Sequence, residues 1–187
     1  MATDFATHSK SWTYEDYHAL PDDQRYEVID GELLPMAPSP ESDHQKFSRA
    51  LVRRLDPYVL SSKLGELLWA PLDVILDDEN IVQPDLVFVS AHRSAIIERR
   101  GIVGAPDLVV EILSPFSVRR DRQRKMRLYA QFGVKEFWIV DPGNHGIEVF
   151  TLKSGAYELL TKGVQRGKIR SLVLNLEFDV ADIIERL

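Results

Sequence analysis

Two apolar runs that flank a basic segment constrain the fold of this chain more than any other feature. The runs "DLVVEIL" at 107–113 and "VKEFWIVDP" at 134–142 have the near-continuous apolar character of strands that are covered on both faces. Between them, the segment from Pro115 to Phe132 reads as a helix that ends at Gly133. A strand, a helix and a strand within about thirty residues predict a βαβ crossover, with parallel strands and a right-handed connection.

The segments on either side of this unit complete a mixed sheet. In chain order, the sequence predicts a short helix from Thr13 to Leu20, a hairpin about Asp30-Gly31, a helix over 41–61, two antiparallel strands over 65–76 and 81–89, a hairpin over 147–160, a strand over 172–178 and a final helix over 179–187. Antiparallel strands followed by a parallel pair, with helices packed on them, make an α/β or α+β fold and exclude an all-β fold.

Composition limits the classes of function. We expect a chain of 187 residues to form a single domain, with residues 1–12 disordered. Because the chain has no cysteine, disulfides, thiolate catalysis and zinc held by thiolates are excluded. The polar opening and the lack of a long apolar run predict no signal peptide, no membrane span and a cytoplasmic location. The net charge of −6 argues against indiscriminate binding to nucleic acid.

Glu111 stands in the middle of the first apolar run, where a carboxylate is rare unless it is paired. An ionised acid that is buried alone costs so much free energy that it must find a partner, bind a metal or take up a proton. We therefore interpret Glu111 as a functional residue rather than as an ordinary core position.

The motif Pro-Asp-Leu-Val occurs twice, so Asp85 and Asp107 compete as the partner of Glu111. If the strands around 83–89 and 106–113 pair antiparallel, residue 85 can lie opposite residue 111, with Cβ atoms within roughly 5 Å of each other. Asp107 shares the face of Glu111 but lies about 13 Å away along the strand. The sequence favours Asp85 as the partner, with an Asx-turn as its alternative role, and predicts an Asx-turn for Asp107.

The helix between the apolar runs holds six cations within positions 119–127, a pattern that for most of its members is typical of a solvated face. At ~100° per residue, the apolar side of this helix gathers Val118, Leu128, Tyr129 and Phe132. Asp121 and Lys125 fall on the same side. The crossover can therefore place Lys125 over Glu111, and an i,i+4 ion pair between Asp121 and Lys125 is the alternative.

Two acids and an ammonium group around a divalent cation form a recurring site for phosphodiester hydrolysis. The repulsion between two close carboxylates is relieved by a shared proton or by a bound divalent cation, and oxygen ligands suit Mg²⁺. In such sites the cation activates water and neutralises the phosphate, while the lysine orients the water or balances developing charge.

Two stretches carry a resemblance to a known family. "WAPLDVILDDENIVQPDLVFV" and "GIVGAPDLVVEILSPFSVRRDRQRKMRLYAQFGVKEFWIVDP" resemble the bacterial "putative restriction endonuclease" family, a branch of the PD-(D/E)XK nuclease superfamily, and the resemblance extends from Tyr14 to Tyr157. It implies a restriction-endonuclease-like fold and cleavage of DNA phosphodiester bonds with Mg²⁺, or with Mn²⁺ as the alternative. It also implies that Asp85 and Glu111 are the metal ligands.

The superfamily motif has a lysine two residues after the second acid, but this chain has Leu113 at that position. The resemblance therefore implies that Lys125 supplies the ammonium group from the following helix, as it does in similar branches of the superfamily. It also identifies Glu27 as a third ligand or a base, with a surface strand carboxylate as the alternative. His44 either joins the site or is a hydrogen-bonded core histidine near a helix start.

Three functions stay open at this point. The leading hypothesis is a metal-dependent endonuclease acting on DNA. Leu113 motivates the second, a catalytically inactive DNA-binding module of the same fold, and the acidic balance motivates the third, a hydrolase of RNA or of small phosphoesters. By analogy with nucleases that cut both strands as symmetric pairs, we expect a homodimer.

Overall fold

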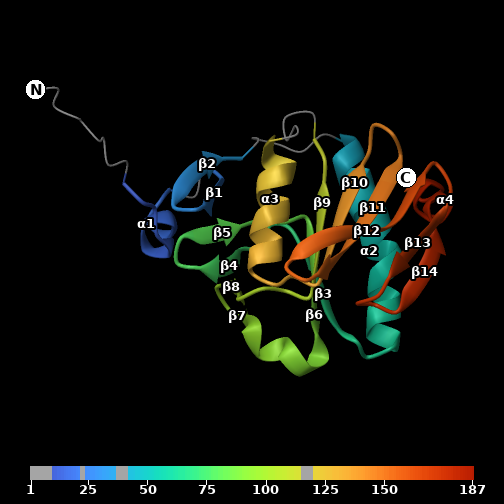
Figure 1. Cartoon of the computed structure of the whole chain (residues 1–187), viewed down its shortest axis with the longest axis horizontal. Coiled ribbons are helices and arrows are strands. Elements are labelled where there is room, and N and C mark those ends of the chain that lie inside the picture. Colours follow the sequence, from blue (N-terminus) through green and yellow to red (C-terminus); the bar gives the residue numbers. More distant parts are fainter. Residues whose placement is uncertain (1–9, 22–23, 37–41, 115–119) are drawn as a thin grey trace, which may run out of the picture.

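The computed structural model describes residues 10–21, 24–36, 42–114 and 120–187, apart from the side chains of residues 120–122. Within these ranges the chain forms two six-stranded sheets, a two-stranded sheet and four α-helices. Figure 1 shows helix α3 (Arg120–Gln131) in front of the strands and helix α2 (Ser42–Ser61) on the opposite side of the sheet at the centre of the molecule. We call this sheet the central sheet and the other six-stranded sheet the lateral sheet.

The central sheet contains the predicted crossover. Its strands lie in the order β12 (Ala156–Val164), β11 (Gly146–Lys153), β10 (Glu136–Asp141), β9 (Leu108–Ile112), β6 (Leu86–Ser90) and β3 (Gly65–Trp69). β9 and β10 are parallel and α3 connects them, whereas the other neighbouring strands of this sheet are antiparallel. α3 is followed by Gly133, whose φ of 77° is typical of a residue that terminates a helix. The predicted βαβ unit and mixed sheet are therefore confirmed.

The lateral sheet forms where two predicted strands break. Its strands lie in the order β2 (Glu32–Pro35), β1 (Tyr26–Ile29), β5 (Asn80–Val82), β4 (Val74–Asp77), β8 (Gly101–Val103) and β7 (Ile97–Glu98). The prediction of two continuous strands over 65–76 and 81–89 is wrong, because each segment crosses from one sheet to the other. The breaks contain Pro71 and Pro84, whose nitrogens cannot donate to a strand ladder.

The predicted elements near the N-terminus are confirmed. Helix α1 (Tyr14–His18) begins with a capping box in which Thr13 and Asp16 satisfy each other's backbone N–H groups. The hairpin of β1 and β2 turns at Asp30 and Gly31, and their positive φ angles of 52° and 69° are those that a tight hairpin turn requires.

The first described residues are held against this hairpin. The backbone N–H of Trp12 donates to the carbonyl of Gly31 at 2.8 Å, so this end of the described chain contacts the turn of the hairpin. The rest of the segment predicted to be disordered, residues 1–9, lies outside the described residues. No helix in the described ranges combines the length and the apolar character that a membrane crossing requires.

Alternation along the central strands decides which side chains face α3. Val110 and Ile112 of β9 pack in the core beneath α2, whereas Val109 packs in the core beneath α3. Because successive side chains point to opposite faces, Glu111 faces α3 together with Val109. The core beneath α3 also includes Ile29 of β1, so α3 packs against both six-stranded sheets.

The remaining differences from the prediction are short elements. Residues 91–103, where the sequence predicts neither helix nor strand, contain the 3₁₀ helix η1 (Ala91–Ile96) as well as β7 and β8. The hairpin of β11 and β12 is confirmed, but the strand expected over 172–178 is replaced by the hairpin of β13 (Lys168–Ser171) and β14 (Leu176–Asp179), followed by helix α4 (Val180–Ile184). Strands of two to four residues contain too few alternations for a sequence pattern to indicate them.

Candidate active site

Two carboxylates meet where β6 and β9 lie side by side. The strands pair antiparallel, with Leu86 opposite Val110. Continuing this register by one residue places Asp85 opposite Glu111, as the sequence predicts. The backbone N–H of Ile112 donates to Asp85 Oδ2 at 2.7 Å, which holds the aspartate against β9.

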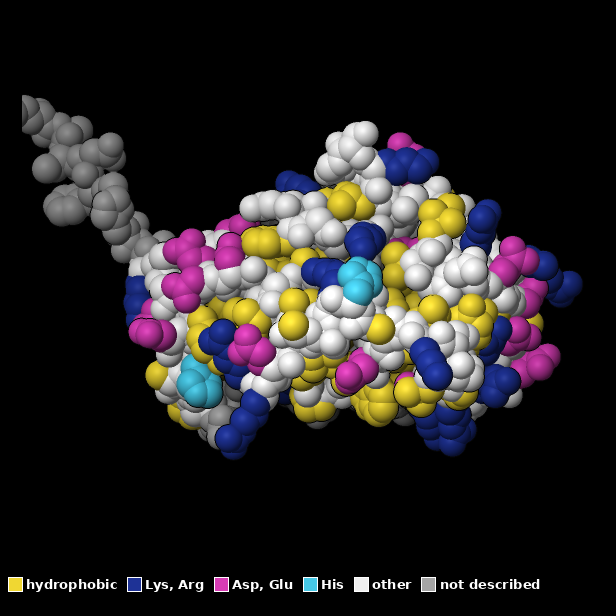
Figure 2. All heavy atoms as spheres, turned by 90° about the horizontal axis from the view of Figure 1, so that it is seen from below, with side chains coloured by type: hydrophobic (Ala, Val, Ile, Leu, Met, Phe, Trp, Pro, Cys, Tyr) yellow, Lys and Arg dark blue, Asp and Glu magenta, His cyan; other side chains and the backbone are white. Residues whose placement is uncertain are grey.

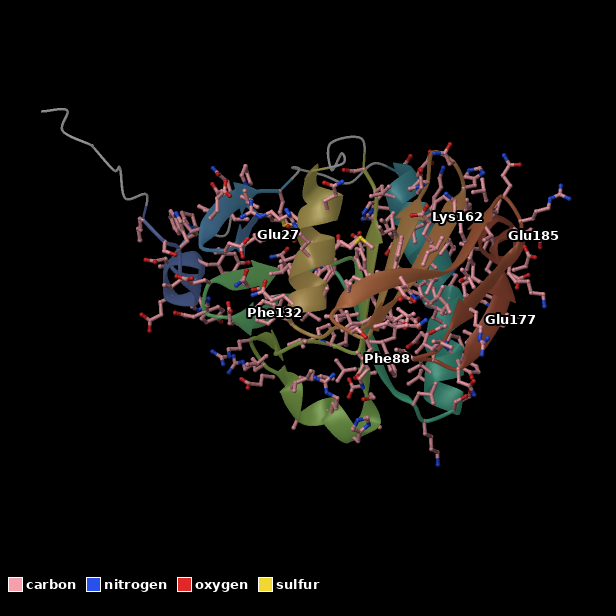
Figure 3. The ribbon with its side chains drawn as sticks, in the orientation of Figure 1. Glu27, Phe88, Phe132, Lys162, Glu177 and Glu185 are labelled. Carbon is pink, nitrogen blue, oxygen red and sulfur yellow. The ribbon has the colours of Figure 1, made fainter. Side chains whose placement is uncertain are left out.

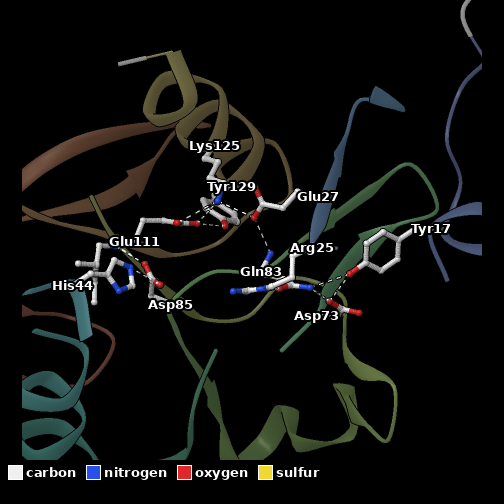
Figure 4. Close-up of polar contacts among 11 residues, drawn as sticks. Tyr17, Arg25, Glu27, His44, Asp73, Gln83, Asp85, Glu111, Lys125 and Tyr129 are labelled. Carbon is white, nitrogen blue, oxygen red and sulfur yellow. Dashed lines mark hydrogen bonds and ion pairs between the residues drawn. The ribbon is translucent and has the colours of Figure 1, made fainter. Parts of the chain in front are cut away.

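Lys125 reaches Glu111 from α3, and it also contacts a third acid, Glu27. Its Nζ lies 3.1 Å from Glu111 Oε1 and 2.8 Å from Glu27 Oε1, as Figure 4 shows. The side chains of Lys125 and Glu27 are 8% and 6% exposed, so water and salt screen their interaction only weakly. The predicted orientation of Lys125 toward Glu111 is confirmed. The side chain of the alternative partner, Asp121, lies outside the described residues.

Glu27 comes from the lateral sheet, on the side that faces α3 (Figure 3). Its Oε1 accepts a hydrogen bond from the backbone N–H of Gln83 at 2.9 Å, in addition to the one from Lys125. Glu27 is therefore a buried member of the cluster and not a surface carboxylate. Through Lys125, it connects the lateral sheet to Glu111 on the central sheet.

A tyrosine completes the contacts of Glu111. The hydroxyl of Tyr129 donates to Glu111 Oε1 at 2.7 Å. Burial, and then the charges of Glu111 and Glu27, raise the pKa of Tyr129 well above its ordinary value, so the hydroxyl keeps its proton and remains a donor. Sequence reasoning assigned Tyr129 only to the apolar side of the helix. Its i,i+4 spacing from Lys125 was the available signal, because such residues share one helix face.

His44 contacts the other carboxylate from the first turn of α2. Its Nε2 lies 3.0 Å from Asp85 Oδ1. Its Nδ1 is buried and has no hydrogen-bond partner in the part of the chain that the structure describes. Of the two roles left open for His44, the structure favours membership of the site, since its polar contact is with Asp85 and not with the core.

Negative charge exceeds positive charge among these acids and the lysine. Glu27, Asp85 and Glu111 contribute three carboxyl groups, and Lys125 contributes one ammonium group. Burial raises the pKa of Glu111 well above its ordinary value; the charge of Lys125 opposes the rise, and the charges of Glu27 and Asp85 add to it. Around neutral pH, such an arrangement holds a proton or accepts a further cation.

The carboxylates fit a divalent ion of the magnesium type. A carboxylate offers about four acceptor positions. Asp85 contacts the Ile112 N–H and His44. Glu111 accepts from the Tyr129 hydroxyl and, through both of its oxygens, from Lys125 Nζ at 3.1 and 3.2 Å, so both carboxylates retain acceptor capacity. Residues 10–21, 24–36, 42–114 and 120–187 contain no group of three or more His, Cys, Asp or Glu side chains arranged to hold a metal. A site of two carboxylates is nevertheless usual for Mg²⁺, which keeps several waters and substrate oxygens as its other ligands.

The helix that carries Lys125 is fastened to the lateral sheet by a second cation. Arg124 Nη1 lies 2.7 Å from Glu32 Oε2, and its Nη2 donates to the backbone carbonyl of Ile29. Arg124 is thus not a member of the solvated face that the basic run predicts for most of its cations. Its contacts with the β1–β2 hairpin keep Lys125 at a fixed distance from Glu27.

Asp107 has a structural role, but not the predicted Asx-turn. Its buried carboxylate accepts hydrogen bonds from the backbone and hydroxyl of Ser90 at 2.9 and 2.8 Å, and pairs with Lys135 at 2.7 Å and Arg93 at 3.0 Å. Burial by itself raises the pKa of Asp107, but the hydrogen bonds from Lys135, Ser90 and Arg93 outweigh it and lower the pKa to about 2. The turn prediction is wrong because these partners come from other elements of the chain.

Glu136 is another buried acid with a structural role. It was not predicted from the sequence because its strand reads as apolar. Its carboxylate accepts hydrogen bonds from Trp138 Nε1 and Ser171 Oγ, and from the backbone N–H groups of Leu172 and Val173, at 2.6 to 3.2 Å. These four donors replace the water that the carboxylate loses on burial. Glu136 therefore anchors the β13–β14 hairpin to the central sheet and is not part of the site.

Comparison with solved structures identifies the fold. A crystal structure described as that of "a putative nuclease belonging to DUF820 from Anabaena variabilis" resembles this chain with a TM-score of 0.75, over 93% of this chain and 98% of the other, at 17% sequence identity. At this identity the likeness shows the fold alone, a mixed α/β fold shared with that protein.

The sequence itself identifies the family. The model of the family Uma2, described as "Putative restriction endonuclease", matches residues 14–181. The chain therefore belongs to the Uma2 family, and the resemblance inferred from its motifs is confirmed. A search of curated proteins found no significant match. Family and fold together indicate a nuclease of the restriction-endonuclease-like type.

Proposed function

We propose that this protein is a Mg²⁺-dependent endonuclease that hydrolyses DNA phosphodiester bonds, with Mn²⁺ as the alternative metal. Asp85 and Glu111 hold the metal ion, and Lys125 assists the attacking water. The observation that carries the proposal is the convergence of two carboxylates from neighbouring strands with an ammonium group from the crossover helix. The choice of DNA rests on the description of the family.

The contacts around the two proposed ligands support this assignment. His44 and the backbone N–H of Ile112 orient Asp85, whereas Lys125 and Tyr129 orient Glu111. Oxygens that are fixed before the substrate arrives need little reorganisation when charge develops on the phosphate. A divalent cation held by them would supply positive charge next to that phosphate.

Lys125 supplies the ammonium group of the motif lysine, whose position is occupied by Leu113 in this chain. An ammonium group beside Glu111 can hydrogen-bond the attacking water and balance the charge of the transition state. Glu27 pairs with Lys125 at 2.8 Å and thereby holds the ammonium group in place. We assign Glu27 this positioning role, in preference to a role as third ligand or base. The position of Lys125 also favours an active enzyme over the inactive binding module that Leu113 suggested.

Plasmid nicking tests the proposal. The wild-type chain should nick supercoiled DNA with Mg²⁺ or Mn²⁺, and EDTA should abolish the reaction. Asp85→Asn, Glu111→Gln and Lys125→Met should each lower the rate by about 100-fold or more, because each removes a group that acts on the transition state. Lys168→Met is the matched control, since this exposed lysine pairs with Glu177 on the β13–β14 hairpin; it should nick at the wild-type rate.

Two results would contradict the proposal. One is nicking that persists in EDTA, and the other is a Glu111→Gln variant that nicks as fast as Lys168→Met. If no metal supports nicking while DNA binding remains salt-sensitive, the inactive DNA-binding module is the correct interpretation.

A further inference from the structure

Arg25 is an exposed arginine near Glu27 of the site, and it has no acidic partner among the residues that the structure describes. Its Nε and Nη2 donate to the side-chain oxygen of Gln83, a neutral amide, at 3.1 and 2.6 Å. No carboxylate in the described part of the chain forms an ion pair with it, whereas Arg93, Arg100 and Arg124 each have one. In a chain of net charge −6, an arginine without a carboxylate partner is available to an anion from outside.

Gln83 connects Arg25 to the site. Gln83 accepts the hydrogen bonds from Arg25 with its side chain and donates its backbone N–H to Glu27 at 2.9 Å (Figure 4). Arg25 also stands two positions before Glu27, at the start of β1, and Asp85 follows two positions after Gln83. An anion bound by Arg25 would therefore lie next to Gln83, which contacts Glu27 and precedes the proposed ligand Asp85 by two positions.

A cavity of about 290 Å³ opens beside Arg25. Tyr17 and Tyr26 contribute aromatic rings to its lining, and Asp73 and Gln83 contribute polar groups. The Tyr17 hydroxyl donates to Asp73 Oδ1 at 2.9 Å, and Gln83 Nε2 donates to the same oxygen at 2.8 Å. The volume is close to the lower end of the range for small-molecule sites, so one small cyclic group is a suitable occupant.

Other surface features are less informative. The face in Figure 2 mixes Lys and Arg with Asp and Glu, and acidic side chains gather at the end of the molecule near α1, so this face is not a uniformly basic surface. A larger hollow of about 410 Å³ lies over α3 and β12, but no carboxylate lines it. It includes Met126 and Arg127, which follow Lys125 on α3 but point away from the acids.

We propose that Arg25 and the cavity beside it bind one nucleotide of the substrate strand, with the phosphate on the guanidinium group and the base in the cavity. The proposal rests on the nuclease function proposed above. A guanidinium group suits phosphate because its planar fork presents several N–H donors. Tyrosine rings offer faces on which any base can stack. Asp73 accepts hydrogen bonds from base N–H groups and repels phosphate, which sets the orientation of the nucleotide.

This geometry makes a prediction about the form of the DNA. A base can enter the cavity only when it is unpaired, because a paired base is held in the helical stack. The site should therefore bind single strands more tightly than duplexes of the same length. Asp73 should contribute to the affinity for single strands but not to that for duplexes, whereas Arg25 should contribute to the affinity for both.

Binding measured without catalysis tests the proposal. The full chain carrying Glu111→Gln, in EDTA, is titrated against a fluorescently labelled single-stranded oligonucleotide at several salt concentrations, and the anisotropy is followed. Adding Arg25→Gln should weaken binding by about 3- to 10-fold and reduce the slope of log K against log[salt] by about 0.7, the value for one phosphate contact on a single strand. Arg25→Lys should weaken binding but keep the slope. Asp73→Asn should weaken binding to the single strand alone.

Arg170→Gln is the matched control, because Arg170 is an exposed arginine on β13, on the far side of the central sheet (Figure 1). It should change neither affinity nor slope. An unchanged slope in Arg25→Gln, or equal effects of Arg25→Gln and Arg170→Gln, would overturn the proposal. Because the assay needs neither metal nor cleavage, a chain that shows the expected slope change but never nicks DNA would refute the nuclease function and leave the nucleotide site standing.

Discussion

At the scale of residues, the site depends on a balance of buried charges. Lys125 lies between Glu27 and Glu111, and all three side chains are largely buried. Removing one partner of a buried ion pair leaves the other charge without compensation, which costs more free energy than the intact pair contributes. The stability of the fold and the chemistry of the site are therefore linked through a single lysine.

Lys125→Met should lower the free energy of unfolding by about 3–5 kcal/mol, because two buried acids lose their counter-ion. Adding Glu27→Gln to that variant should recover part of the loss, since only one of the two acids then remains uncompensated. Urea unfolding in EDTA measures both effects. Lys168→Met removes an exposed lysine and should change the free energy by no more than about 0.5 kcal/mol. Equal losses in Lys125→Met and Lys168→Met would mean that the buried ion pairs do not contribute as described.

At the scale of elements, Asp107 joins segments that are distant in the chain. It links the end of β6 through Ser90, η1 through Arg93 and the segment before β10 through Lys135. These contacts lie at the opposite end of β9 from Glu111, so they hold the strand in register without taking part in the site. Their strength depends on the ionised form of Asp107, because a carboxylate makes stronger hydrogen bonds than a neutral acid.

The lowered pKa of Asp107 predicts a pH dependence of stability. In the folded state the pKa is about 2, below its ordinary value of 3.8, so the unfolded chain binds this proton first as the pH falls. The stabilisation is complete above the ordinary pKa and is lost as the pH falls through the folded value. Asp107→Asn should be less stable than wild type by on the order of 1–2 kcal/mol at neutral pH. The difference should begin to narrow below about pH 4 in urea titrations; a difference that stays constant down to pH 3 would contradict the assignment.

At the scale of the whole molecule, α3 packs against both six-stranded sheets and thereby assembles the site. Glu27 comes from the lateral sheet and Glu111 from the central sheet, and Lys125 on α3 contacts both. Asp85 lies opposite Glu111, next to the start of β6. A shift of α3 along either sheet would separate these groups. The position of one helix therefore determines whether the carboxylates and the lysine can act on the same phosphate.

The oligomeric state is also a property of the whole molecule. We propose that the protein is a homodimer, because a nuclease that cuts both strands of a duplex can do so with two copies of one site related by symmetry. Sedimentation equilibrium should give twice the chain mass of 21.4 kDa. A species of 21.4 kDa at all concentrations would contradict the proposal without affecting the assignment of the catalytic residues.

Relations that repeat along a single element follow from the sequence alone. The period of two in strands placed Asp85 opposite Glu111, and the period of 3.6 in the crossover helix turned Lys125 toward the sheet. The turn at Asp30-Gly31 was also predictable, because the tendency to adopt positive φ angles is a local property of these residue types. The family motif added Glu27, whose role local patterns leave open.

Which elements contact each other depends on the fold as a whole. His44 and Asp85, or Tyr129 and Glu111, contact each other because helices pack on a sheet at particular angles and depths, and no residue spacing encodes these quantities. The same applies to Asp107. Its carboxylate contacts residues on three other segments instead of forming the expected local turn. Local periodicity specifies the face on which a side chain lies, whereas its partner depends on the packing of the whole chain.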